Sequence, residues 1–281
     1  MFDLRPPAEE DPVNANPPAR NSYYERIDEN RYKPTPHAGG GWDPSEQHFG
    51  PVGGLVTHAI DRYLAGRPDT GMVLGRISFD ILGRLASDEC EVRVETVRPG
   101  RTIELIEATV LIAARPVVRA RAWMLTALDT GAVAGGGAER LTPPDALAPW
   151  PMSSVWPGGF VASLDVRTVA EPQPGRTTAW VSTDVALVGG EAASPLASYV
   201  TLVDTANGIA IRQPPSRWMF PNVDLTIHLH RQPEGRWAGL DTTVAFGPTG
   251  QGITSTVLHD LAGPIGHAQQ ILTVRPQPTA D

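Results

Sequence analysis

The residue best placed for chemistry is Asp204, the one acid in an apolar stretch between Leu196 and Ile211. A carboxylate on such a helix lies either on its solvated side or at a polar site inside the protein. Partial loss of water raises the pKa of a carboxyl group, which can then take a proton from water as a general base. Asp204 is therefore our first candidate for a catalytic group.

Two histidines suggest a metal site at first sight. His228 and His230 alternate along one expected strand, so both side chains point to the same face. A metal site needs further ligands, and no third ligand with matching spacing is evident. We therefore interpret both histidines as polar residues of a strand face and expect no metal.

The single cysteine, Cys90, cannot form an internal disulfide and lies between Glu89 and Glu91. Neighbouring acids raise the pKa of a thiol and make it a poor nucleophile. Cys90 is therefore interpreted as a packing residue, and a lone cysteine fits a reducing compartment.

The bulk composition limits the class of protein. The chain has 281 residues, 41% of them hydrophobic, and a net charge of -8. This length suits two domains of ordinary size. The negative charge without a basic stripe argues against a nucleic-acid partner. No apolar run approaches the ~18 residues of a membrane span, and no signal peptide is visible, so we expect a cytoplasmic protein.

Residues 1–21 contain five prolines and scattered acids, which predicts an extended or disordered arm. A strand is expected over 22–31, and two Gly-rich loops then lead to a helix over 55–64. From 72 to 128, apolar residues alternate with polar ones, which is typical of antiparallel strands. Residues 22–128 thus form one α+β unit.

Residues 129–158 are rich in Gly, Ala and Pro and form the expected connector. The order of the first half then recurs over 159–281, with a strand over 176–188, a helix over 194–211 and four strands over 223–274. Two units with the same order of elements indicate an internal duplication.

Four places in the chain resemble the acyl-CoA thioesterase II family. These are the Gly-Gly entry at 49–54, Asp204 in the second helix, the strand at 224–231, and the last strand, which begins at Gly266 and carries Gln270. The resemblance covers residues 22–275 and implies an α+β fold of two fused hotdog domains, each a curved antiparallel sheet wrapped round a long helix.

The resemblance also implies the activity, which is hydrolysis of an acyl-CoA thioester to free CoA and a carboxylic acid. Asp204 would activate the water and Gln270 would orient it, although Gln269 on the opposite face remains an alternative to Gln270. A backbone N–H near Gly189 and Gly190 could hold the oxyanion. No metal or redox cofactor is implied, the partner is acyl-CoA, and a homo-oligomer is expected.

One position departs from the family. The third family residue is a hydroxyl, and the aligned residue is Asn222. Thr226 lies four residues further on, and a regular strand would place both on one face with Asp224. Either Asn222 replaces the hydroxyl or Thr226 supplies it.

Two other functions compete with the thioesterase. His48 and Asp61 resemble the His and acid of hotdog dehydratases, in which the His takes a proton from C2 of a 3-hydroxyacyl chain. A non-catalytic hotdog protein that binds acyl-CoA is the other alternative, because Asn222 replaces a hydroxyl.

Overall fold

The structure is a computed structural model that describes residues 21–278. The expected N-terminal arm therefore lies, except for its last residue, outside the described residues. The elements of the first half are β1 (Ser22–Arg26), β2 (Arg31–Pro34), η1 (Pro36–Ala38), α1 (Phe49–Ala65), β3 (Met72–Ile81), β4 (Cys90–Arg98), β5 (Ile103–Ile112) and β6 (Arg115–Thr126).

The segment that follows contains short helical turns and no strand before residue 164. These turns are η2 (Gly131–Val133), η3 (Pro144–Ala146), η4 (Met152–Ser154) and α2 (Gly159–Ala162). The second half then contains β7 (Leu164–Thr168), β8 (Arg176–Thr183), β9 (Ala186–Val188), α3 (Pro195–Val203), α4 (Thr205–Ile209), β10 (Trp218–Met219), β11 (Asp224–Leu229), β12 (Ala238–Phe246), β13 (Gln251–Asp260), β14 (Gly263–Thr273) and β15 (Arg275–Pro276).

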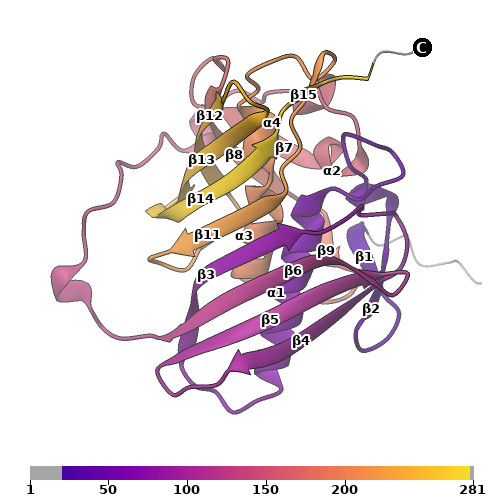
Figure 1. The fold of residues 1–281 in the computed structure, drawn as a ribbon. Coiled ribbons are helices and arrows are strands. Elements are labelled where there is room, and N and C mark those ends of the chain that lie inside the picture. Colours follow the sequence, from indigo (N-terminus) through magenta and orange to yellow (C-terminus); the bar gives the residue numbers. More distant parts are fainter. Residues whose placement is uncertain (1–20, 279–281) are drawn as a thin grey trace, which may run out of the picture.

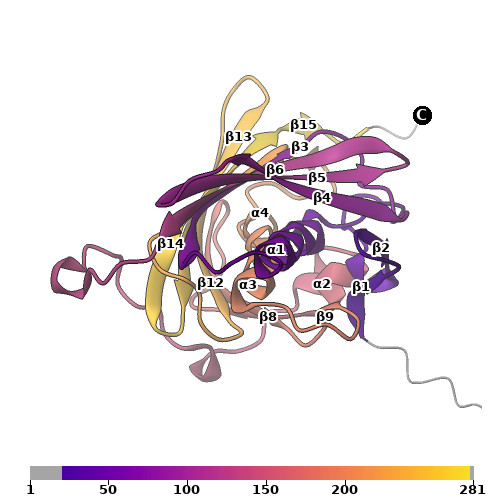
Figure 2. The same cartoon turned by 90° about the horizontal axis from the view of Figure 1, so that it is seen from below.

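The strands of both halves form one continuous sheet (Figure 1). Its order is β7-β8-β12-β13-β14-β11-β3-β6-β5-β4-β2-β1-β9. The halves meet where β11 pairs antiparallel with β3, and again where β9 pairs parallel with β1. The strands thereby surround α1 and α3 (Figure 2).

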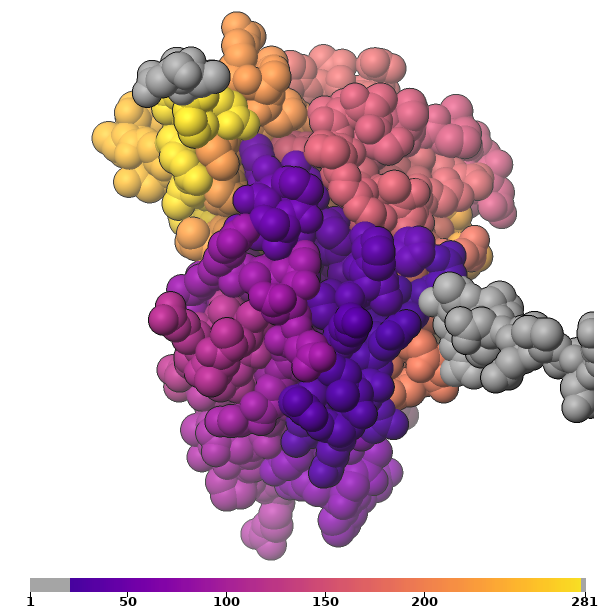
Figure 3. Space-filling view, turned by 90° about the vertical axis from the view of Figure 1, so that its right-hand side faces the viewer, coloured from indigo at the N-terminus to yellow at the C-terminus, as the bar shows by residue number. Residues whose placement is uncertain are grey.

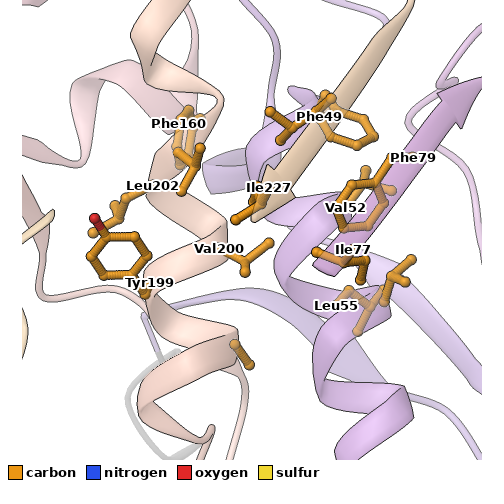
Figure 4. Packing of buried hydrophobic residues seen from close by; sticks show 14 of the residues in the cluster. Phe49, Val52, Leu55, Ile77, Phe79, Phe160, Tyr199, Val200, Leu202 and Ile227 are labelled. Carbon is orange, nitrogen blue, oxygen red and sulfur yellow. The ribbon is translucent and has the colours of Figure 1, made fainter. Parts of the chain in front are cut away.

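The two helices share one hydrophobic core with the sheet (Figure 4). Phe49 of α1 packs edge-on against Phe79 of β3, with ring centroids 5.4 Å apart. Val200 of α3 lies between the helices, and Ile77 and Ile227 approach from the paired strands β3 and β11. All five side chains are buried. The core therefore bridges the two halves of the chain.

Helix α1 begins at Phe49, six residues earlier than the expected start at Leu55. His48 caps it, because its Nδ1 accepts from the N–H of Gly50 at 3.0 Å. Glycine is disfavoured inside helices, but a Cβ at Gly50 would lie 2.5 Å from the carbonyl oxygen of Thr201. Close contact with α3 thus explains the glycines that had indicated a loop.

The helix expected over 194–211 is two helices, α3 and α4, because the helix is interrupted at Asp204. The strand expected over 22–31 is likewise two strands. Asp28 turns the chain there, since its Oδ1 accepts from the N–H groups of Asn30 and Arg31. The strand expected over 176–188 is interrupted between β8 and β9.

The start of the second half packs against the N-terminal segment (Figure 3). The N–H of Phe160 in α2 donates to the carbonyl oxygen of Gly39 at 3.2 Å. The indigo segment that contains Gly39 accordingly lies against the rose segment near residue 160. Gly40 and Val161, the next residues of the two segments, line the cavity described below.

The packing of α1 on α3 predicts opposite effects at two adjacent glycines. A Cβ at Gly54 would collide with Oγ1 of Thr201, whereas at Gly53 it would meet only Phe49 and Val200 at ordinary distances. We expect Gly54→Ala to lower the free energy of unfolding by about 1–3 kcal/mol. Gly53→Ala, the matched control, should raise it by about 0.5–1 kcal/mol. Denaturant unfolding measures both, and equal stability of the two variants would contradict the close helix contact.

Candidate active site

The structure places Asp204 at the centre of a buried polar cluster. Its side chain is 5% exposed, at the junction of α3 and α4. Its Oδ1 accepts from Nε2 of Gln270 at 2.7 Å and from Nδ2 of Asn222 at 2.9 Å. Two neutral amides therefore orient one carboxylate oxygen without neutralising its charge.

Gln270 reaches Asp204 because it lies on the inner face of β14. It is 2% exposed, whereas Gln269 points to the outer face opposite Thr226. The strand alternation thus brings Gln270 to the acid, and not Gln269.

Asn222 precedes β11 and forms an isolated bridge with Leu272. Further along the strand, Thr226 pairs with Gln269. Four steps from Asn222 to Thr226 therefore match three steps on β14, which defines a β-bulge. The carboxylate of Asp224 stabilises the bulge by accepting from the N–H of Ile271 at 2.6 Å.

The prediction that Asn222 and Thr226 share one face is therefore wrong, because it assumed a regular strand. Leu225 and Ile227 are fully buried against the helices, which directs Thr226 to the outer face. Asn222 points inward to Asp204. The structure brings Asp204, Gln270 and Asn222 together and leaves Thr226 outside this cluster.

His48 contacts the second oxygen of the acid. Its Nδ1 lies 3.4 Å from Oδ2 of Asp204. The imidazole also stacks on Phe160 of α2, with ring centroids 4.3 Å apart. The cap of α1 thus lies directly beside the candidate general base.

Burial reverses the usual order of the two pKa values. Loss of water raises the pKa of Asp204 to about 7, although its hydrogen bonds from Asn222 and Gln270 oppose the shift. Burial lowers the pKa of His48 to about 4. The pair is therefore not an ion pair near neutral pH, where His48 is neutral and Asp204 titrates.

A cavity of about 220 Å³ opens beside Asp204. Its wall includes His48, Asn222, Trp42, Met152 and Trp156. Trp42 packs edge-on against Trp156 and Phe220, at centroid distances of 4.7 and 5.3 Å. The cavity therefore combines one polar end with an aromatic wall.

Three buried side-chain oxygen atoms near Asp204 have no hydrogen-bond partner within residues 21–278. They are Oε1 of Gln270, Oγ1 of Thr205 and Oδ1 of Asn207. Thr205 and Asn207 also line the cavity. Buried polar groups are nearly always paired, so these atoms are available to a water or a substrate.

Several residues considered from the sequence lie elsewhere. Asp61 accepts from Oγ of Ser194 at 2.6 Å. It is also thirteen residues from His48 along one helix, roughly 20 Å at the helical rise. The two cannot act on one substrate atom, so the dehydratase alternative loses its acid. The N–H of Gly189 donates to the carbonyl oxygen of Tyr24 and is not free for an oxyanion.

His228 and His230 are exposed on β11 and the turn after it. Across residues 21–278, no three His, Cys, Asp or Glu side chains converge as a metal site would require. Cys90 is buried, and burial raises the pKa of its thiol to about 12. In the same part of the chain, none of the helices has the length and hydrophobicity to cross a bilayer.

From the sequence, His48 is a candidate only for the dehydratase alternative, and Thr205 and Asn207 are not singled out. The position of His48 directly before a Phe-Gly-Pro sequence, where it caps α1, was a usable signal. Nothing local indicated that this cap would meet Asp204. That contact depends on the packing of α1 against α3.

Two protein families match consecutive parts of the chain. The acyl-CoA thioesterase N-terminal domain matches residues 38–125, and the acyl-CoA thioesterase C-terminal domain matches residues 144–274. The chain therefore belongs to the acyl-CoA thioesterase family, and it is a thioester hydrolase. No match was found among curated proteins.

Solved structures confirm the fold. A hot dog fold protein of unknown function from Alicyclobacillus acidocaldarius has a TM-score of 0.71 at 13% identity, covering 92% of this chain and 98% of the other. An acyl-CoA thioesterase II from Mycobacterium marinum gives 0.60 at 15% identity, with 90% and 96% covered. The tesB protein of Mycobacterium avium subspecies paratuberculosis gives 0.63 at 15%, with the same coverage. The expected α+β double hotdog is thus confirmed.

The raised pKa of Asp204 predicts a pH-dependent cost to stability. Between pH ~4 and ~7 the unfolded chain loses this proton while the folded chain keeps it, so the stability of the folded state falls as the pH rises. Above pH ~7 the cost is complete, on the order of 4 kcal/mol. Asp204→Asn should therefore unfold at higher denaturant than wild type, by a margin that grows from pH 4 to 7 and then stays constant.

The control is Glu95→Gln, at an exposed acid on β4. This control removes one carboxyl group that is not buried, so the margin that Asp204→Asn shows beyond it is the part due to burial. A margin at Asp204 that is independent of pH would show that the carboxyl is not perturbed by burial.

Proposed function

We propose that acyl-CoA thioesters are hydrolysed in the cavity beside Asp204, with the ionised carboxylate as the general base. The observation that carries this proposal is a buried acid with a pKa near 7, held by Gln270 and Asn222 at the wall of a cavity. A base with a pKa near the working pH combines a useful ionised fraction with the strength to accept a proton.

The water molecule would be held between two acceptors. Gln270 donates its Nε2 hydrogen to Asp204, so its unpaired Oε1 can accept one hydrogen of the water. The carboxylate accepts the other hydrogen. The water oxygen is then left with its lone pairs free for attack on the carbonyl carbon.

The reaction proceeds by addition and elimination. Asp204 takes a proton from water as the new C–O bond forms and the carbonyl oxygen becomes an oxyanion. Collapse of this intermediate breaks the C–S bond, and Asp204 returns the proton to the CoA sulfur. The products are a carboxylic acid and free CoA, and neither oxidant nor reductant is consumed.

We further propose a role in lipid metabolism in the cytoplasm, as a homo-oligomer. The lone, buried Cys90 supports a reducing compartment. Val73, Ile103 and Leu125 are exposed at 37%, 39% and 40% and are neighbours across β3, β6 and β5. Such an apolar patch on an outer sheet face is suited to contact with a second copy.

Loss of the base should abolish most of the hydrolysis. We expect Asp204→Asn to reduce kcat about 10²–10⁴-fold, because the amide cannot accept the proton from water. For wild type, kcat/KM should rise with pH up to about 7 and then level off, because only the ionised acid is active. Release of CoA from a panel of acyl-CoAs, followed with a thiol reagent, measures both. Wild-type turnover in the variant would refute the assignment.

Asn222 and Thr226 should differ sharply when each is replaced. Thr226→Val should leave turnover within about threefold of wild type, because Thr226 lies on the outer face. Asn222→Leu removes a hydrogen bond that lowers the pKa of Asp204, so the acid limb of the pH profile should move above about 7. Asn222→Thr should restore turnover if its hydroxyl replaces that bond. A large loss in Thr226→Val with an unchanged Asn222→Leu would assign the hydroxyl role to Thr226.

A further inference from the structure

His48 is a polar side chain at the cavity that has no role in the hydrolysis described above. It caps α1, contacts Asp204 and lines the cavity, with 19% of its side chain exposed. Thioester hydrolysis also needs a donor for the oxyanion, since removing one such donor typically costs about 10²–10³ in kcat. The question is whether the imidazole presents a proton to the cavity.

The helix cap determines which ring nitrogen carries the proton. The N–H of Gly50 donates to Nδ1 at 3.0 Å, so Nδ1 is an acceptor and the proton of the neutral ring is on Nε2. Asp204 approaches the same nitrogen at 3.4 Å, but no hydrogen bond is found between them. A proton on Nδ1 would leave the Gly50 N–H without its partner at the helix start.

The ring is held in one place and without charge. It stacks on Phe160 at a centroid distance of 4.3 Å, and its Nδ1 is fixed by the backbone of α1. Burial lowers the pKa of His48 to about 4, so the imidazole stays neutral at the pH where Asp204 is ionised. A neutral imidazole can act as an electrophile toward a carbonyl group.

The Nε2 atom is available to a ligand. It forms no hydrogen bond to any residue in the described part of the chain, and the side chain lines the cavity. Two backbone donors that could serve the oxyanion are already used, since Gly50 donates to His48 and Gly189 donates to Tyr24.

We propose that the Nε2–H of His48 donates a hydrogen bond to the thioester carbonyl oxygen and stabilises the oxyanion, an inference that rests on the proposed role of Asp204. The donor, at the start of α1, and the base, at the end of α3, would then act on one substrate in the same cavity. Asp204 removes the proton of water while His48 receives the negative charge that develops on oxygen. Transfer of the ring proton is not required, because the oxyanion collapses to expel the CoA sulfur.

Two substitutions separate the donor from the helix cap. His48→Asn keeps an acceptor for the Gly50 N–H, since Asn is a favourable N-cap residue, but has no donor at the position of Nε2. It should fold with wild-type stability and lose about 10²–10³ in kcat, with little change in KM. The acid limb near pH 7 should remain, because it belongs to Asp204. His48→Gln, whose longer amide can reach the position of Nε2, should recover part of this loss.

Wild-type kcat in a folded His48→Asn variant would overturn the proposal. Disappearance of the acid limb in this variant would overturn it as well, because His48 itself would then be the titrating base. Turnover that depends on Asp204 but not on His48 would reject this inference alone. A wild-type protein that hydrolyses nothing in the panel would reject the proposed function instead.

Nitrogen NMR of protein labelled with ¹⁵N-histidine decides the tautomer independently of turnover. The signals of His48 are assigned by their absence from the spectrum of His48→Asn. At pH 7–8 we expect a protonated Nε2 and an unprotonated Nδ1. A protonated Nδ1, or a charged ring, would refute the proposed donor even if no substrate is found.

Discussion

The close approach of α1 and α3 is the contact on which the site depends. Gly50 and Gly54 leave no Cβ between the helices, so the backbone of α1 lies against Thr201 of α3. Asp204 lies three residues after Thr201, where α3 ends. His48 lies two residues before Gly50 and caps the start of α1. The same packing that fuses the two hotdog units therefore sets the distance between the acid and the imidazole.

Burial of Asp204 links the chemistry to the stability of the fold. Two amides hold one oxygen of the carboxylate, but burial still raises its pKa to about 7. A fully solvated acid would be ionised throughout the neutral range, yet it would be a much weaker base. In the proposed mechanism, the burial that destabilises the folded state also gives Asp204 the strength of a useful base, and such perturbed pKa values are common at functional sites.

Much of the fold could be predicted from the sequence, because strand alternation and the repeated order of elements depend on local residue patterns. The position of Asp204 in an apolar helix and the match of Gln270 to the last family strand singled out two residues that the structure joins in one buried polar cluster. The start of α1 was missed because its glycines disfavour a helix locally and are needed only for tertiary packing. The bulge after Asn222 was missed because register depends on the partner strand β14, which no local pattern specifies.

The sheet joins the two halves at two separate seams, β11 with β3 and β1 with β9. At each seam, an edge strand of one half forms its backbone hydrogen bonds with an edge strand of the other half. Either half alone would leave these backbone groups unpaired. Cleavage of the peptide chain within 129–140, where every residue is exposed and no strand occurs, would leave both seams and the shared core in place. The two hotdog units thus share one sheet and one core, so we expect them to unfold together as one cooperative unit.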